Sequence, residues 1–229
     1  MDDFSIGLAL FNFLPILFWA AAFVALAHLV GLGAPGHIWL VWVGGGLVVL
    51  GGLTKATWKL IVAVSGPDLV WLSNALFPLL GAGFVLLAAG VWGGLRGLAG
   101  RMPGPSLWLA PTVLIIAALA AAAWRTWGLE ITRGWFLPLM MLTSLGNLGL
   151  SLLLIATTLR RRLWLAATLF IANVAMIFAL QPIAVMEPKT VAVHWLEQSL
   201  TALGTAGFAL AAWLLYRAAR GSGTATRDA

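Results

Sequence analysis

Seven long apolar runs divide the sequence, and they constrain the fold more than any other feature. Each run is long enough to cross a bilayer, which takes about 20 mostly apolar residues in an α-helix. The runs cover residues 4–30, 37–60, 67–94, 106–127, 135–159, 163–186 and 190–217. Because 62% of the residues are hydrophobic and only 9% are charged, most of this surface must face lipid. The sequence therefore predicts an all-α, polytopic membrane protein with a single bundle of seven transmembrane helices.

The connections between the runs are short and rich in glycine, proline and charged residues. No connection is long enough to fold as a separate domain, so any function must lie in or between the helices. Residues 1–219 are predicted to form one transmembrane domain. Residues 220–229 are mostly small and polar, and they are predicted to form a disordered cytoplasmic tail.

Lysine and arginine indicate the orientation, because cytoplasmic loops carry an excess of both residues. With an external N-terminus, the cytoplasmic side holds Arg96, Arg101, Arg160, Arg161, Arg162, Arg217, Arg220 and Arg227. The external side then holds Lys55, Lys59, Arg125, Arg133 and Lys189. This bias predicts an N-out, C-in protein of a bacterial inner (plasma) membrane. The net charge of +6 is explained by these helix ends, so no nucleic-acid partner is expected.

A weak internal repeat links the odd-numbered runs. Pro15, Pro78 and Pro138 each follow an aromatic residue closely and precede an apolar pair. The repeat would make three helical hairpins plus a seventh helix, with the prolines kinking or loosening their helices near one membrane face. The alternative is that proline near helix ends recurs without duplication.

Polar residues gather at the start of the seventh run, in "KTVAVHWLEQSL". At 100° per residue, His194, Glu197, Gln198, Thr201 and Thr205 share one helix face. Polar groups in a membrane helix are costly, so they usually face the bundle interior and mark a candidate site. This face is therefore predicted to form one wall of a shallow polar pocket.

The second run carries a glycine stripe that ends in Lys55 and Lys59. The glycines predict close approach of a neighbouring helix. The lysines either extend past Trp58 to the headgroups or hold an anion between helices. The predicted ligand-binding residues are Lys55, Trp58, Lys59, Trp71, Asn74, Gln181, His194, Glu197, Gln198 and Thr201.

These residues predict a receptor-like or transporter-like protein that binds a small anionic or amphiphilic molecule at its outer face. A purely structural explanation stays open, in which Glu197 pairs with a lysine such as Lys55 and fixes the helix register. Two further alternatives are an accessory subunit that packs against a membrane-protein partner, and an intramembrane enzyme that uses His194 and Glu197.

Several kinds of chemistry lack the residues that they need. The chain has no cysteine, which excludes thiol catalysis, iron-sulfur clusters and cysteine zinc sites. His194 and Glu197 share a helix face but lack further ligands at their depth, so no metal site is predicted. The chain lacks an intramembrane hydrolase motif such as GxSxG, and a retinal protein would need a Schiff-base lysine in the middle of the last run, which has none. No residue is assigned as catalytic. Nothing in the sequence identifies a cofactor.

Overall fold

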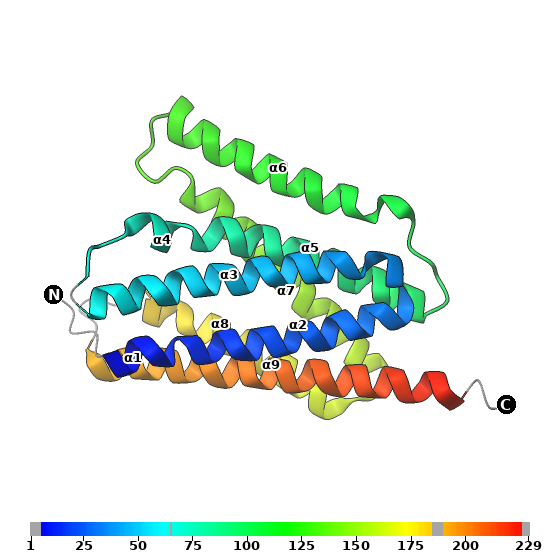
Figure 1. Ribbon diagram of the computed structural model, residues 1–229. Coiled ribbons are helices and arrows are strands. Elements are labelled where there is room, and N and C mark those ends of the chain that lie inside the picture. The colour runs from blue at the N-terminus through cyan, green and yellow to red at the C-terminus, as the bar shows by residue number, and fades with distance from the viewer. Residues whose placement is uncertain (1–5, 65, 185–189, 226–229) are drawn as a thin grey trace.

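The computed structural model describes residues 6–64, 66–184 and 190–225, of which residues 181–184 and 222–225 are described by their backbone alone (Figure 1). Its α-helices are α1 Ile6–Phe11, α2 Phe13–Gly33, α3 Ile38–Ala63, α4 Val70–Asn74, α5 Leu76–Leu98, α6 Leu109–Ala123, α7 Phe136–Arg160, α8 Trp164–Ala184 and α9 Val191–Ala225. Short 3₁₀ turns precede α3 and α6 at Pro35–His37 and Pro105–Trp108, and a π-helical turn follows α6 at Trp124–Gly128.

These helices confirm the predicted helical membrane bundle. Within the described residues, six segments are long and apolar enough to cross a bilayer, and α8 is a further apolar helix between α7 and α9. The segments run up and down in turn, so α1 and the C-terminal end of α9 lie at opposite ends of the bundle (Figure 1). We call these the N-terminal end, which is the predicted outer one, and the C-terminal end, which is the predicted inner one.

The first and third segments are interrupted close to their prolines. The first breaks between α1 and α2 at Asn12, and the third breaks between α4 and α5 at Ala75. Pro15, Pro78 and Pro138 are each the third residue of α2, α5 and α7, in the first turn, where a missing N–H removes no bond from that helix. The predicted loosening is thus observed at Pro15 and Pro78 but not at Pro138, where α7 continues without a break, and the repeat itself stays a prediction.

Glycine lets α3 and α5 pack closely. A Cβ placed on Gly44 would lie 2.7 Å from the carbonyl oxygen of Gly83, and a Cβ on Gly83 would lie 2.7 Å from the carbonyl oxygen of Gly44. Neither position can carry a side chain without moving the backbone. The close approach predicted from the glycine stripe is therefore confirmed, and its partner is α5.

The core lies between α2, α3, α5, α7, α8 and α9. Phe23, Phe170 and Phe208 are buried in it, and Trp19 packs against their cluster. Helix α6 lies at the edge of the bundle, against α5 and α7, and most of its surface is exposed (Figure 1). The interior available for a binding site is therefore formed by the other long helices.

The last helix is longer than a membrane span. It continues to Ala225, whereas the disordered tail was predicted to begin at residue 220. Residues 226–229 lie outside the described part of the chain. Arginines near a helix C-terminus interact favourably with the helix dipole, which favours the helix at Arg217 and Arg220, whereas the sequence GSGTA at 221–225 has a low helix propensity.

Candidate functional site

A cavity of about 180 Å³ lies between α2, α3, α5 and α9 toward the N-terminal end of the bundle. Its lining residues are Asn12, Pro15, Ile16, Trp19, Val48, Gly52, Lys55, Ala56, Leu76, Leu80, Phe84, Gln198 and Thr201. An apolar cavity of about 150 Å³ holds benzene, so this space suits a ligand with one ring or a short chain. Three members of the predicted ligand set line it: Lys55, Gln198 and Thr201.

The polar part of the cavity centres on Lys55. Its Nζ donates a hydrogen bond to Oγ of Ser73 at 2.6 Å. The same ammonium lies 4.2 Å from the ring centroid of Trp58, a distance typical of a cation–π contact. Both of these partners are uncharged. Of the described residues that line the cavity, none is acidic.

A second lysine, outside the cavity lining, contacts one of the residues at its rim. Nζ of Lys59 donates to Oδ1 of Asn12 at 3.0 Å, and Nδ2 of Asn12 donates to the carbonyl oxygen of Leu8 at 2.7 Å. Asn12 is the residue at which the first segment is interrupted. The Lys59 contact therefore fixes the amide of a cavity-lining residue and adds a second positive charge nearby.

Aromatic side chains close the cavity on the side that faces the core. The ring of Trp19 lies 5.5 Å from that of Phe84 and 4.7 Å from that of Phe208. Phe208 also meets Phe170 at 4.9 Å. Rings at these distances pack in favourable tilted or edge-to-face arrangements. The floor of the cavity is therefore apolar and well packed, whereas its rim is polar.

Two residues of the polar face predicted on the last helix, Gln198 and Thr201, line the cavity. Gln198 is buried, and Thr201 lies one turn further into the membrane. Oγ1 of Thr201 donates to the carbonyl oxygen of Glu197 at 2.7 Å, and Oγ1 of Thr205 donates to that of Thr201 at 2.9 Å. Both hydroxyl protons are thus used within the helix, which leaves their oxygens as acceptors.

The remaining predicted residues lie around the rim or farther away. Nε1 of Trp58 donates to Oδ1 of Asp68 at 2.8 Å in the connection after α3, and Trp71 is 66% exposed. Asn74 is the last residue of α4 and does not line the cavity. Their roles as ligand-binding residues stay predictions.

Three more predicted residues lie on α8 and α9. His194 and Glu197 are half-buried in the first turns of α9, outside the cavity lining. Gln181 lies in α8, but its side chain is outside the described part of the structure. The described residues include no group of three or more His, Cys, Asp or Glu side chains placed to hold a metal ion.

Sequence reasoning missed several residues of the site, chiefly Asn12, Trp19, Ser73 and Phe84. Asn12 carried a usable signal, since it is a lone amide within an apolar run. Trp19 and Phe84 carried none, because aromatic residues in membrane helices also face lipid. Ser73 stands next to Asn74 in the sequence, yet only the fold shows that it contacts Lys55.

A second group of buried polar side chains lies deeper, on α7 and α8. Ser151 and Asn173 are 1% and 2% exposed. Within the described residues, Oγ of Ser151, Oδ1 of Asn147 and Nδ2 of Asn173 have no hydrogen-bond partner. These atoms do not line the cavity. Comparisons with protein-family models, curated proteins and solved structures found no match for the chain, so the candidate function rests on geometry alone.

Proposed function

We propose that the protein binds a small anionic amphiphile in the cavity, as part of a receptor-like or transporter-like role at the outer face of the membrane. The observation that carries this proposal is the position of Lys55, whose ammonium borders an apolar cavity and contacts uncharged groups. A charge at this depth is costly unless it is paired. Asp68 acts on Lys55 electrostatically but does not line the cavity, so an anionic head group would supply a counter-charge within it.

The shape of the cavity supports an amphiphile over a simple inorganic anion. Its rim carries an ammonium, two amides and a hydroxyl, from Lys55, Asn12, Gln198 and Thr201. Its floor is formed by the Trp19 and Phe84 rings. A carboxylate with one ring or a short chain would place its charge on the rim and its apolar part on the floor.

The test is a thermal-shift measurement on the purified full-length protein. Benzoate and hexanoate are the anionic probes, and benzyl alcohol and benzylamine are probes of similar size without the negative charge. At 100 times its Kd, a ligand stabilises the folded state by about 2.7 kcal/mol. For a chain of this length, that corresponds to an increase in Tm of about 5–10 °C. We expect this increase with the anions alone.

The matched variants are Lys55→Gln and Arg125→Gln. Both remove one positive charge from the same end of the bundle, but Arg125 is not among the residues that line the cavity. Hydrogen bonds to charged groups contribute about 1.5–3 kcal/mol, so Lys55→Gln should weaken the binding of benzoate by about 10- to 100-fold. Equal losses in the two variants, or equal shifts with the alcohol and the acid, would contradict the proposal.

A transporter and a receptor differ in what happens after the ligand binds. The Trp19 and Phe208 rings close the cavity on its core side, so this conformation would have to open for the ligand to cross. Uptake of labelled benzoate into proteoliposomes, lost in Lys55→Gln, would support a transporter. Binding without uptake would support a receptor.

A further inference from the structure

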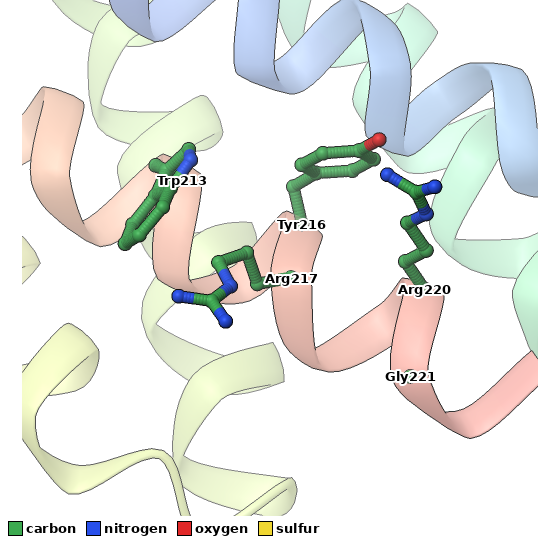
Figure 2. Close-up of a pocket in the computed structure, with 5 residues that line it drawn as sticks. All are labelled: Trp213, Tyr216, Arg217, Arg220 and Gly221. Atoms are coloured by element: carbon green, nitrogen blue, oxygen red, sulfur yellow. The ribbon is translucent and has the colours of Figure 1, made fainter.

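A basic surface hollow lies at the other end of the bundle. It has a volume of about 470 Å³ and is lined by Trp213, Tyr216, Arg217, Arg220 and Gly221, all from α9 (Figure 2). Figure 2 shows the Tyr216 hydroxyl and the Arg220 guanidinium extending to the same side of the helix, whereas the Arg217 guanidinium extends toward Trp213. Cζ of Arg217 lies 4.8 Å from the ring centroid of Trp213. This hollow shares no lining residue with the outer cavity.

The depth of the hollow matches the boundary between hydrocarbon and headgroups. At 1.5 Å per residue, the distance from Trp195 to Tyr216 along α9 is about 30 Å, the thickness of the hydrocarbon core. Tryptophan and tyrosine are enriched at both interfaces. With Trp195 at the outer boundary, Tyr216 lies at the inner one, and Arg217 and Arg220 lie at the level of lipid phosphates.

The turn between α7 and α8 adds three more arginines at the same end. Helices α8 and α9 run antiparallel and meet where Phe170 contacts Phe208 (Figure 1). Arg162 is as far along the chain from Phe170 as Tyr216 is from Phe208. Arg160, Arg161 and Arg162 therefore lie at the depth of Tyr216, and all three are exposed.

Arg162 adopts a backbone conformation that glycine adopts more easily. Arg162 has φ +57°, in the left-handed region. The N–H of Leu163 donates to the carbonyl oxygen of Thr158 at 2.9 Å, and that of Arg162 donates to Leu159 at 3.0 Å. This is the Schellman ending of a helix, in which glycine is the usual residue at the left-handed position.

No negative charge offsets these arginines in the described part of the C-terminal end. The described acidic residues are Asp68, Glu130 and Glu197, which lie before α4, before α7 and at the start of α9. All three positions belong to the N-terminal end of the bundle. The five arginines at 160–162, 217 and 220 thus form a positive surface that no acidic residue in the described part of the chain offsets.

We propose that this surface binds the headgroup phosphate of an anionic phospholipid from the inner leaflet. Guanidinium groups bind phosphate through paired hydrogen bonds, and basic pockets beside transmembrane helices bind anionic headgroups. Arg220 and the Tyr216 hydroxyl, which extend to the same side of α9, bind the phosphate, and Arg217 beside Trp213 adds a second guanidinium to the hollow. The turn at 160–162 adds attraction, and Trp213 packs against the first part of the acyl chains.

The test compares lipids on the full-length protein in a mild detergent. Thermal shift and native mass spectrometry are measured with phosphatidylglycerol, phosphatidylcholine and inorganic phosphate. We expect stabilisation and retained adducts with phosphatidylglycerol alone. Equal effects of the two lipids would overturn the proposal, and so would an effect of inorganic phosphate equal to that of phosphatidylglycerol.

Two double variants distinguish specific lipid binding at Arg217 and Arg220 from general attraction by the positive charge at this end of the bundle. Arg217→Gln with Arg220→Gln should reduce the affinity for phosphatidylglycerol at least tenfold. The matched control is Arg96→Gln with Arg101→Gln, which removes the same charge from the same end. It also breaks the same kind of contact, since Cζ of Arg96 lies 4.7 Å from the Trp92 ring. The control should change the affinity less than twofold, and equal losses would overturn the proposal.

Arg162→Gly keeps the test decisive if the double variant folds poorly. Glycine adopts the left-handed conformation without strain, so this variant should have a higher Tm than the wild type when no lipid is added. It should still bind phosphatidylglycerol about threefold more weakly, because one charge is missing. An unchanged affinity in this variant would overturn the proposal that these arginines bind the headgroup together.

Discussion

Replacing Gly44 with alanine tests the contact that positions α3 against α5. The added Cβ would lie 2.7 Å from the Gly83 carbonyl oxygen, 2.9 Å from the Leu87 nitrogen and 3.1 Å from Cβ of Leu86. All three atoms belong to the backbone or are fixed to it, so no rotamer change relieves the contact. The two helices must move apart, and overpacking of this kind costs about 1–3 kcal/mol.

Gly46→Ala is the matched control on the same helix. A Cβ at Gly46 meets nothing within 4 Å, so the substitution only replaces glycine by a better helix former, which stabilises by about 0.5–1 kcal/mol. The same gain offsets part of the cost at Gly44, which leaves that variant about 1–2 kcal/mol less stable than the wild type. The two variants should therefore change stability in opposite directions.

The assay is thermal unfolding in a mild detergent, with benzoate binding measured alongside. About 1–2 kcal/mol corresponds to a decrease of about 2–8 °C for a chain of this length. Val48, one turn from Gly44, lines the cavity, and so does Phe84, which follows Gly83. Gly44→Ala should therefore also weaken benzoate binding, whereas Gly46→Ala should not. Equal Tm changes in the two variants would refute the proposed α3–α5 contact.

Three other substitutions test the core and the rim. Ser151→Ala removes a buried hydroxyl that has no hydrogen-bond partner among the described residues, so the free energy of unfolding should stay equal or increase by up to about 1 kcal/mol; a clear loss in thermal unfolding would contradict this. Phe208→Ala should lower the free energy of unfolding by about 3–5 kcal/mol, because the ring is fully buried against Trp19 and Phe170. A loss under about 1 kcal/mol would contradict the packing of this ring in the core. Trp58→Phe keeps a ring beside Lys55 but removes the donor to Asp68, so benzoate affinity should fall less than about threefold; calorimetric titration measures it, and complete loss would show that the indole N–H is needed.

The helices could be predicted because each signal acts locally along the chain. An apolar run of sufficient length forms a transmembrane helix wherever it lies, since the bilayer leaves backbone groups no other hydrogen-bond partners. The breaks before Pro15 and Pro78 have an equally local cause, because a helix that continued through either proline would lose the hydrogen bond to the carbonyl four residues earlier. The glycines of α3 predicted close packing from a local property as well, because they have no side chain to hold a neighbouring helix away. Only the structure identifies α5 as that neighbour.

The site was predicted only in part because it depends on which helix faces meet. Helical phase correctly placed Gln198 and Thr201 on one face, and it placed His194 and Glu197 there as well. Phase does not give the depth at which neighbouring helices leave a space. That space begins at the level of Gln198 and extends inward, so the two titratable residues lie outside its lining.

The helix interruptions explain why both lysines of α3 find uncharged partners. The first segment breaks at Asn12, whose Oδ1 accepts a hydrogen bond from Lys59. The third breaks just after α4, in which Oγ of Ser73 accepts a hydrogen bond from Lys55. Asn12 also satisfies a carbonyl of α1 through its Nδ2. Each break thus supplies one neutral acceptor that binds a lysine near the cavity.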